Sequence, residues 1–393
     1  MNIGIVLAAI PGYSETFFRN KIRFLQSATN TKVILCVDQK SKPQEWEGTE
    51  VVYGVTLSKN GLYRSFQVIL AVVKSLLFHP VKTTRLFVYN KMDGFSVKKN
   101  IQAIVSAAHL FSLKLDWLHF GFGTLAIGRE NVSKVLGAQM AVSFRGFDHY
   151  VYPLKHKDCY RLTFQKGKRF HVLSEGMAKA LISNGVAEPD IEVIPPAIDI
   201  DQFDSLPDTP RSSDRLLQLV TVARLHWIKG LEYTLEALAL LKKEGINFRY
   251  TIIGEGDERE RLIFAVHQLN LKEQVVFAGR QSQSEIVAIC QKADIYIQYS
   301  IQEGFCNAVL EAQAMGLWCV VSDAEGLTEN VINNETGWVV PKRQPGLLAH
   351  KLIEITLLKG ERVEEVRKNV RRRVRNDFSL QLQKERFLHF YRL

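Results

Sequence analysis

Two glutamates, Glu303 and Glu311, are separated by seven residues in the stretch EGFCNAVLEAQAMG at 303–316. In a continuous helix, eight steps of about 100° would leave their side chains roughly 80° apart, so they would not share one catalytic face. Gly304 favours a tight loop, and Asn307 is predicted to cap a helix that runs through Met315. We therefore expect Glu303 in the loop and Glu311 on the second turn of the helix.

This arrangement suits a ligand that carries both phosphate and hydroxyl groups. Unpaired N–H groups at the start of a helix form a ready site for phosphate. Carboxylates repel phosphate but accept hydrogen bonds from vicinal hydroxyls, as an acidic residue does from ribose in dinucleotide-binding folds. A diphosphate with hydroxyls on both sides, which is the chemistry of a nucleotide sugar, would satisfy the two glutamates and the helix terminus together.

Two cations follow a predicted strand in VARLHWIKGLEYTLEAL (222–238), with Arg224 at the strand end and Lys229 just before Gly230. A diphosphate calls for a point charge and fork-like hydrogen-bond donors, which Lys and Arg supply. Two solvated loop cations are an equally good interpretation of this motif taken alone.

The elements that must position these residues are short β-branched runs that alternate with helical patterns. In the first half they are IGIVLAA (3–9), KVILCVD (32–38), RLFVYN (85–90), DWLHF (116–120), AVSFRG (141–146), HVLSE (171–175) and IEVIP (191–195). In the second half they are LQLVTVAR (217–224), FRYTIIGEG (248–256), QVVFAGR (274–280), ADIYIQYS (293–300), WCVVSDAEG (318–326) and TGWVVP (336–341). Strands separated by helices predict parallel sheets covered on both faces, hence an α/β fold.

A proline-rich linker divides the two series. Residues 195–215 read PPAIDIDQFDSLPDTPRSSDR, a composition typical of interdomain segments. We expect one doubly wound, Rossmann-like domain at 1–205, a second at 206–375, and a C-terminal helix at 376–393 that crosses back to the first domain. The two domains would face each other across a cleft, since ligands of open α/β sheets bind beyond the carboxyl ends of the strands.

Taken together, these motifs resemble the retaining glycosyltransferases of family four, which have the two-domain GT-B fold. Glu303 and Glu311 match the E-x7-E motif of that family, and Arg224 and Lys229 match its diphosphate-binding pair. The similarity extends over nearly the whole chain, through PGYSETFFRNKI (11–22), FHVLSEGMAKAL, VIPPAIDIDQF, IIGEGDERERL and ETGWVVP. The first of these looks like the N-terminal loop of bacterial exopolysaccharide and lipopolysaccharide members.

The resemblance implies a role for each matched residue. Glu311 would hold the donor ribose, Glu303 would contact hydroxyls of the donor sugar, and Arg224 and Lys229 would stabilise the leaving diphosphate. The backbone of the helix start would touch phosphate or sugar, the nucleotide base would lie at the end of a strand, and the N-terminal loop would contribute a glycine. The residues concerned are Phe305, Cys306, Asn307 and Ala308, then Gly279 and Arg280, and Gly12.

One departure from the family concerns the acceptor side of the reaction. Many relatives carry a His-Gly or His-Thr pair after the fifth strand, whereas this chain has SFRGFDHY with Arg145 in that place. Arginine stays protonated, so Arg145 cannot act as a base, but it can hold a phosphate oxygen or an acceptor group. Asp148 would orient Arg145, bind the acceptor or cap a helix. His119 and His149 lie beside apolar residues and are predicted to be structural.

The resemblance also implies retention of anomeric configuration. No carboxylate is clearly placed as a nucleophile for double displacement, and the E-x7-E spacing does not reproduce the carboxylate pair of retaining glycosidases. Our hypothesis is front-face substitution, in which the departing diphosphate accepts the acceptor's proton. We expect no metal and no cofactor, because the cations can stabilise the diphosphate and no Asp-x-Asp arrangement is predicted to hold a metal.

Charge suggests where the protein works. The net charge is +10, of which residues 1–205 carry +8, with 25 Lys and Arg against 17 Asp and Glu. This excess, including six basic residues in KHKDCYRLTFQKGKR (155–169), predicts docking of the N-terminal domain on anionic lipid, where a lipid-linked acceptor would be found. The segment 62–82 has an apolar stripe beside Arg64, Lys74 and Lys82, and its simpler interpretation is a core-facing helix.

We expect no membrane-spanning segment, since none approaches the roughly 18 apolar residues that a span requires. The five scattered cysteines indicate neither a disulfide framework nor a zinc site. We therefore expect a cytoplasmic protein, peripheral on the inner face of the plasma membrane.

Three other classes compete with a glycosyltransferase. The high pI and RRRVR suggest a nucleic-acid binder, but recognisable modules with interleaved aromatic and basic residues are missing, so nucleic acid is not an expected partner. GEGDER is only a partial dinucleotide motif, which makes a dehydrogenase a weak alternative. Arg145 leaves open a catalytically degenerate nucleotide-binding protein.

Overall fold

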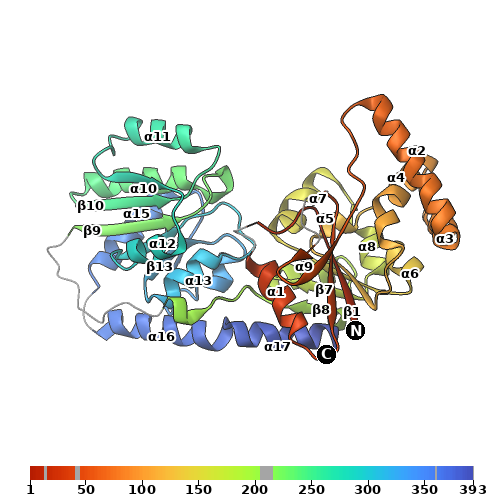
Figure 1. Ribbon diagram of the computed structural model, residues 1–393. Helices are drawn as coiled ribbons and strands as arrows, with labels where there is room; N and C mark the ends of the chain where they lie inside the picture. Colours follow the sequence, from red (N-terminus) through yellow and green to blue (C-terminus); the bar gives the residue numbers. More distant parts are fainter. Residues whose placement is uncertain (13–15, 40–44, 204–215, 359–360, 393) are drawn as a thin grey trace. The chain divides into compact units, whose positions relative to one another are not determined.

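The computed structural model describes residues 1–12, 16–39, 45–203, 216–358 and 361–392 (Figure 1). The chain forms two compact units. Unit 1 comprises Met1–Ile194 and Lys384–Leu393, and unit 2 comprises Pro195–Gln383. The chain thus passes between the units at Pro195, whereas the predicted boundary at 205/206 lies in a stretch outside the described residues. The predicted third segment, 376–393, is divided between the two units.

Unit 1 is built on one sheet of eight strands in the order β3-β4-β2-β1-β5-β6-β7-β8. Its pairs are parallel except for the short β3·β4 hairpin. The strands are β1 Asn2–Leu7, β2 Lys32–Val37, β3 Glu45–Trp46, β4 Thr49–Tyr53, β5 Trp117–Phe120, β6 Gln139–Ser143, β7 Arg169–Val172 and β8 Ile191–Val193. The α-helices are α1 Thr16–Gln26, α2 Gly61–Phe78, α3 Pro80–Met92, α4 Val97–Ala107, α5 Gly123–Ala126, α6 Val132–Leu136, α7 Tyr152–Lys155, α8 Arg161–Lys166 and α9 Glu175–Ser183.

Unit 2 has a sheet of six parallel strands in the order β11-β10-β9-β12-β13-β14. The strands are β9 Leu217–Val222, β10 Phe248–Ile253, β11 Val275–Gly279, β12 Ile295–Gln298, β13 Trp318–Ser322 and β14 Trp338–Val340. The α-helices are α10 Leu231–Lys243, α11 Arg259–Gln268, α12 Gln283–Cys290, α13 Asn307–Ala314, α14 Leu327–Asn330, α15 Pro345–Thr356 and α16 Glu361–Asp377, followed by α17 Leu380–Tyr391, which enters unit 1.

Both sheets reverse their winding direction at one point. In unit 1 the chain winds outward from β1 through β2 and β4, then returns to β5 on the other side of β1. In unit 2 it winds from β9 through β10 to β11, then returns to β12 on the other side of β9. Loops at the carboxyl ends of the two strands that flank such a reversal diverge, and the crevice between them is the usual ligand site of open α/β sheets.

The central strands are nearly continuous apolar runs because both of their faces are covered. Ile3, Ile5 and Val6 of β1 are fully buried, and all four residues of β12 are buried. Two apolar cores in unit 2, one on each side of its sheet, take up residues such as Leu235 and Leu238 on one side and Val309 and Leu310 on the other. This is the burial pattern that the sequence predicts for parallel strands.

Two local predictions were wrong. Residues 85–90 do not form a strand: they lie within α3, where Pro80 occupies the first helical turn, Leu86 and Asn90 are buried, and Val88 is exposed. A short apolar run fits both a strand and a buried helix segment, so periodicity did not separate them. The sequence analysis also missed β4, which extends the sheet beyond β2.

A third prediction that failed concerns α2. The helix was expected to face the core, but only Ala71 and Ser75 of its residues are buried. Its 18 residues are also long and apolar enough, by length and composition alone, to cross a membrane, so the expectation that no segment approaches such a span was wrong. In the sequence, Arg64 and Lys74 interrupt the apolar residues of this helix, so it does not read as one continuous apolar run.

Candidate active site

The centre of the candidate site in unit 2 is an ion pair between Lys229 and Glu303. Lys229 lies in the loop after β9, and Glu303 lies in the loop after β12, the two strands that flank the winding reversal. Each side chain is 14% exposed. Burial alone would lower the pKa of Lys229, but the carboxylate of Glu303 outweighs it, so that the pKa of Lys229 lies above its usual value. The lysine is therefore held as a cation.

Backbone contacts fix the two loops against each other. The N–H of Ile301 donates to the carbonyl of Ile228 at 2.8 Å, one residue before Lys229. Gly230 has a positive φ of +60°, and a Cβ there would collide with the carbonyl of Tyr299. Only glycine tolerates both conditions, so Gly230 allows the close approach that brings the lysine to the glutamate.

The loop after β13 supports Glu303 from the other side. The N–H of Gly326 donates to the carbonyl of Glu303 at 3.0 Å, and a Cβ on Gly326 would collide with the carbonyl of Gly304. Buried Asn330 holds Cys306 by two hydrogen bonds, accepting from its N–H at 2.9 Å and donating to its carbonyl at 3.2 Å. The segment between the glutamates is thus positioned by two residues that the sequence analysis did not identify.

Arg224 is exposed and close enough to Lys229 to oppose its charge. Its loop is braced by the one after β10, because the N–H of Leu225 donates to the carbonyl of Glu255 at 2.9 Å. Gly254 and Gly256 lie against this loop, with positive φ values of +135° and +159°, and a Cβ on either would collide with its carbonyls. The glycines of GEGDER therefore allow close packing of the two loops.

Glu311 lies on the second turn of α13, and Glu303 lies in the preceding loop, as the sequence indicated. Burial raises the pKa of the Glu311 carboxyl to about 7, against a smaller opposing effect of its hydrogen bond with Gln283. Gln283 is the first residue of α12, four positions after Gly279. The carboxyl of Glu311 is thus adjacent to the segment that follows β11, where the family resemblance implies that the base would lie.

The start of α13 differs from the prediction. Asn307 is the first helical residue, not the cap: the N-cap is Cys306, whose side chain makes no capping hydrogen bond. The helix ends at Ala314, with Met315 as its C-cap. Val309 and Leu310 are buried inside the unit, which fixes the rotation of the helix. The first N–H groups of α13 therefore receive no side-chain cap from Cys306.

The other predicted residues of unit 2 lie around this centre. Phe305 and Ala308 are half-buried on either side of the helix start, and the ring of Phe305 lies 5.6 Å from that of Phe378. Gly279 ends β11 with a φ of +66°, and Arg280 after it is exposed.

In unit 1, Arg145 follows β6 and its guanidinium stacks on aromatic rings. Its Cζ lies 3.4 Å from the ring centroid of Phe17, 5.0 Å from that of Phe18 and 5.7 Å from that of Phe122. Phe17 and Phe18 belong to α1, which follows β1, and Phe122 follows β5. Arg145 is thus held at the winding reversal of the first sheet.

Asp148 is fully buried and serves the local structure. Its carboxylate accepts from the N–H and the hydroxyl of Thr124, each at 3.0 Å, and from the N–H of Arg145 at 3.2 Å. Burial raises its pKa, although these hydrogen bonds act in the opposite direction. Of the three roles left open for Asp148, the structure supports orientation of the Arg145 backbone.

His119 is structural, as expected. It is fully buried and bonds Lys21 Nζ at 2.9 Å, Ser143 Oγ at 2.7 Å and Tyr391 Oη at 2.6 Å. His149 lies in a π-helical turn at Phe147–Val151, with its ring 4.5 Å from that of Tyr150. Gly12 is exposed after β1, next to residues 13–15, which are outside the described ranges.

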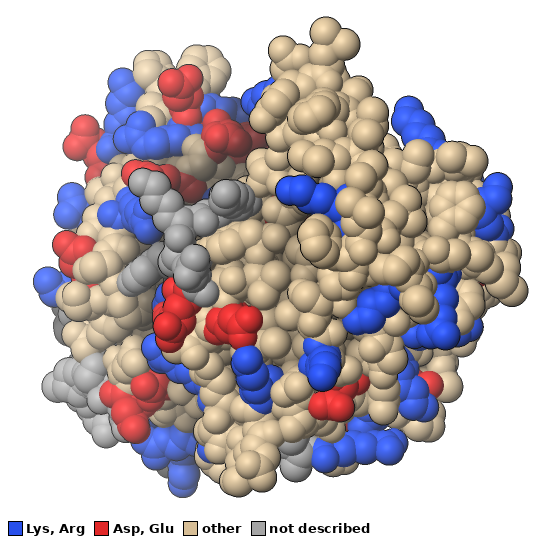
Figure 2. All heavy atoms as spheres, turned by 45° about the vertical axis from the view of Figure 1, so that its right-hand side comes forward, with Lys and Arg blue, Asp and Glu red and all other residues tan. Residues whose placement is uncertain are grey.

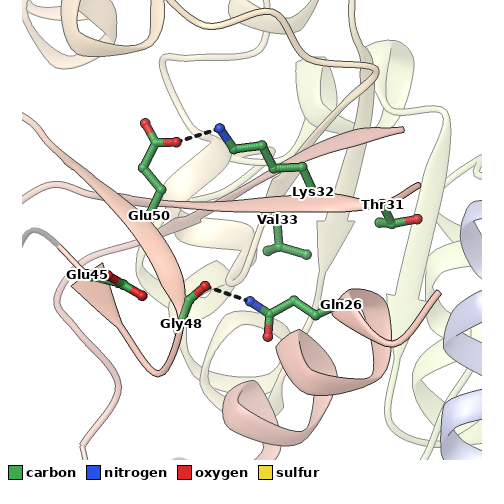
Figure 3. A pocket seen from close by; sticks show the side chains of 7 residues that line it. All are labelled: Gln26, Thr31, Lys32, Val33, Glu45, Gly48 and Glu50. Carbon is green, nitrogen blue, oxygen red and sulfur yellow. Dashed lines mark hydrogen bonds and ion pairs between the residues drawn. The ribbon is translucent and has the colours of Figure 1, made fainter. Parts of the chain in front are cut away.

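A pocket elsewhere in unit 1 contains none of the predicted site residues (Figure 3). It lies at the edge of the sheet beside β2 and β4, where Lys32 and Glu50 form an ion pair at 2.7 Å and Gln26 donates to the carbonyl of Gly48 at 3.2 Å. Within the described part of the chain, no three His, Cys, Asp or Glu side chains gather as a metal site. The expectation of metal-free chemistry stays a prediction.

Comparison with known proteins finds a family similarity in the second half of the chain. Residues 204–375 match the family described as glycosyl transferases group 1. WcaL of Salmonella typhimurium, a protein assigned to colanic acid biosynthesis as a glycosyltransferase, is 26% identical over 403 residues, which cover 97% of each chain. The amylovoran biosynthesis glycosyltransferase AmsK of Erwinia amylovora is 27% identical over 375 residues and 91% of each chain.

Solved structures share the fold. A glycosyltransferase from Rickettsia africae superposes with a TM-score of 0.72 at 21% identity, covering 100% of this chain and 97% of that chain. HepE of Anabaena, in complex with UDP, superposes with a TM-score of 0.71 at 14% identity, covering 100% of this chain and 99% of the HepE chain. The predicted GT-B fold and the resemblance to exopolysaccharide glycosyltransferases are thereby confirmed.

Proposed function

We propose that the protein transfers a sugar from a nucleotide-sugar donor to a glycan or lipid-linked glycan, because residues 204–375 match the family described as glycosyl transferases group 1. The acceptor would belong to a cell-surface polysaccharide such as an exopolysaccharide, a capsule or a lipopolysaccharide, in keeping with the similarity to WcaL and AmsK. The reaction would take place at the cytoplasmic side of the membrane, as a hexosyl transfer with retention of configuration.

The observation that carries this proposal is the charged cluster at the reversal of the second sheet. Lys229 is a cation fixed by Glu303, and Arg224 stands exposed nearby. A leaving diphosphate can be bound by these two cations and by the N–H groups at the start of α13. HepE, which shares the fold, binds UDP in its solved structure, and this supports a uridine nucleotide as ligand of the present protein.

The two glutamates divide the remaining contacts. Glu311 can accept hydrogen bonds from the ribose hydroxyls, with the base toward Gly279 and Arg280. Glu303 can accept from the sugar while its other contact holds Lys229. A carboxylate that serves both groups would couple sugar binding to the position of the lysine.

The proposed chemical step is a front-face substitution. The bond between the anomeric carbon and the phosphate oxygen breaks, the acceptor oxygen bonds to the same face of that carbon, and the acceptor's proton passes to the departing diphosphate. Arg224, Lys229 and the helix terminus stabilise the charge that grows on the leaving group. Arg145 would hold an anionic or hydroxyl group of the acceptor.

A ligand screen tests the proposal directly. Purified protein is heated with UDP, GDP, ADP, CMP or NAD, and unfolding is followed by fluorescence. A ligand at about 100 times its dissociation constant stabilises the folded state by roughly 2.7 kcal/mol. Stabilisation by one nucleoside diphosphate, lost in Glu311→Ala and retained in the control Glu273→Ala, supports the site and identifies the base. Glu273 is an exposed residue of the same unit.

Two results would contradict the proposal. Stabilisation by NAD alone would favour the dinucleotide-binding alternative. A nucleoside diphosphate that stabilised Glu311→Ala as well as the parent protein would remove Glu311 from the site.

A further inference from the structure

Helix α2 exposes a continuous apolar face. Leu62, Phe66, Ile69, Val73, Leu76 and Leu77 are all exposed, at up to 87% for Leu62. At about 100° per residue they occupy an arc of roughly 100°, which is the width of a core-facing stripe. This stripe, however, lies opposite Ala71 and Ser75, the residues by which the helix packs on unit 1. On a surface helix of a soluble protein, the solvent-facing side is normally polar and the packed side apolar. In α2 the solvent-facing side is the apolar one.

The helix is firmly attached through its inner face. Ser75 Oγ lies 2.7 Å from Thr83 Oγ1, and the Thr83 hydroxyl also donates to the carbonyl of Ser75 at 2.9 Å. Asn60 caps the start of the helix, where its Oδ1 accepts from the N–H of Leu62 at 3.1 Å. Helix α2 also packs against α4. Figure 1 shows α2 and α3 side by side at the edge of unit 1, away from the sheet.

The charges around the stripe have one sign. Between residues 55 and 100, the exposed charged side chains are all basic: Lys59, Arg64, Lys74, Arg85, Lys91, Lys98 and Lys99. The one acidic residue of this range, Asp93, is half-buried and forms an ion pair with Lys166. Figure 2, which brings the side of α2 and α3 forward, shows a wide uncharged area with Lys and Arg at its margins and few acidic side chains.

We infer that α2 is a membrane-docking helix that lies in the surface of an anionic lipid bilayer. Its apolar stripe enters the boundary between headgroups and acyl chains, and the surrounding lysines and arginines contact lipid phosphates. The positive charge argues for this occupant over a second copy of the chain, since two such surfaces would repel each other. Docking brings unit 1 to the surface where a lipid-linked acceptor of the proposed reaction would be found.

The helix lies in the membrane surface and does not cross the bilayer. With 18 residues it is about 27 Å long, close to the hydrocarbon thickness. If α3 and α4 entered the bilayer with α2, their basic residues would be buried in hydrocarbon at a high cost in free energy. To span the bilayer, α2 would therefore have to separate from α3 and α4. The bonds of Ser75 to Thr83 oppose such a release.

The first experiment measures binding of the full chain to vesicles of phosphatidylglycerol and phosphatidylethanolamine by co-sedimentation. We expect Phe66→Ser with Leu77→Ser to weaken partitioning by about tenfold for each side chain lost. The matched control is Phe264→Ser in α11, because Phe264 and Phe66 are 63% and 60% exposed. It should bind like the parent protein. Equal binding of the parent protein and the double variant would overturn the inference.

Two further measurements distinguish the ways in which the protein could bind. Phe66→Trp should gain emission that is blue-shifted by vesicles and quenched by brominated acyl chains, whereas Phe264→Trp should not. Arg85→Glu with Lys74→Glu should weaken binding at low salt and lose this difference at high salt, with Lys272→Glu as control. An unquenched Trp at position 66, or a dimer in sedimentation that Phe66→Ser dissociates, would show that the stripe has another occupant.

Discussion

The cationic side chains at the winding reversals of the two sheets make different contacts. In unit 2, Lys229 faces a carboxylate, and Arg224 stands exposed beside it. In unit 1, Arg145 lies on the ring of Phe17, and the nearby carboxylate of Asp148 binds the backbone of Arg145. An ion pair opposes the desolvation of its members, whereas an aromatic face orients a cation through contact with its rings.

The difference indicates two kinds of ligand. The cluster in unit 2 concentrates positive charge against a helix terminus, which fits a diphosphate. Arg145 offers one planar, oriented group, which fits a single oxygen pair. Variants of the two sites should therefore separate effects on the leaving group from effects on the acceptor.

The largest effect is expected for Arg224→Ala. Removal of one preorganised donor to the leaving group costs about 100- to 1000-fold in turnover. Single-turnover measurements with the nucleotide sugar identified by the ligand screen would test this, with Arg249→Ala as a control because Arg249 is exposed in the same unit. Near-normal turnover in Arg224→Ala would remove the diphosphate assignment.

Arg145→Gln should act on the acceptor. Loss of a charged hydrogen bond costs roughly 1.5–3 kcal/mol, so kcat/KM for the acceptor should fall about 10- to 100-fold. The dissociation constant of the nucleoside diphosphate should stay unchanged, and Arg145→Lys should recover part of the activity. If donor affinity fell in parallel, the contrast between the two units would be wrong.

The pH dependence of donor binding should report Glu311. Its pKa of about 7 means that the free carboxyl is mostly protonated at pH 6, and a ligand that needs the carboxylate must first remove that proton. The dissociation constant should then be about tenfold larger at pH 6 than at pH 8. Since the phosphate of the ligand also titrates, Glu311→Gln serves as reference: an identical slope in both proteins would contradict the assignment.

The smallest effects concern stability, and they should have opposite signs in the two units. Burial holds the pKa values of His119 and His171 far below 6.5, so the unfolded chain binds more protons and unit 1 loses stability as the pH falls below 6.5. Burial raises the pKa of Glu311 from 4.5 to about 7, so its contribution to unit 2 declines as the pH rises through that window.

Hydrogen exchange read by mass spectrometry resolves peptides of each unit. Each group changes the free energy of unfolding by at most about 1.4 kcal/mol per pH unit. Protection in unit 1 should fall between pH 7 and pH 5.5, less so in His171→Asn. Protection in unit 2 should rise as the pH falls, and Glu311→Gln should abolish this rise. Parallel changes in both units would contradict these signs.

The sequence predicted the parts of the site that depend on local order. Glu303 in a loop and Glu311 on the second turn followed from helix geometry and one glycine. Asn330 and Gly326 were missed because their roles arise from contacts with Cys306, Gly304 and the backbone of Glu303, more than 20 residues away. A glycine or asparagine in a loop gives no sign in the sequence of which distant backbone it meets.

The fold was predicted where strands are buried on both faces and failed where an apolar run has two interpretations. Residues 85–90 carry β-branched and aromatic side chains, yet Pro80 and the packing of Leu86 make them helical. For α2, periodicity gave the apolar stripe correctly but not the side that it faces. Orientation depends on which face meets α3 and α4, and that is decided by tertiary packing.

The division of the chain between units also affects the order in which they can be completed. Unit 2 is inserted, in sequence, between Ile194 and Lys384, and Phe387, Phe390 and Tyr391 enter the core of unit 1. During synthesis, the ribosome therefore delivers all of unit 2 before unit 1 receives these side chains. In a nascent chain, the core of unit 1 therefore lacks these side chains until α17 emerges. A nonsense codon near Lys384 would remove them and so damage unit 1, although most of unit 1 is synthesised first.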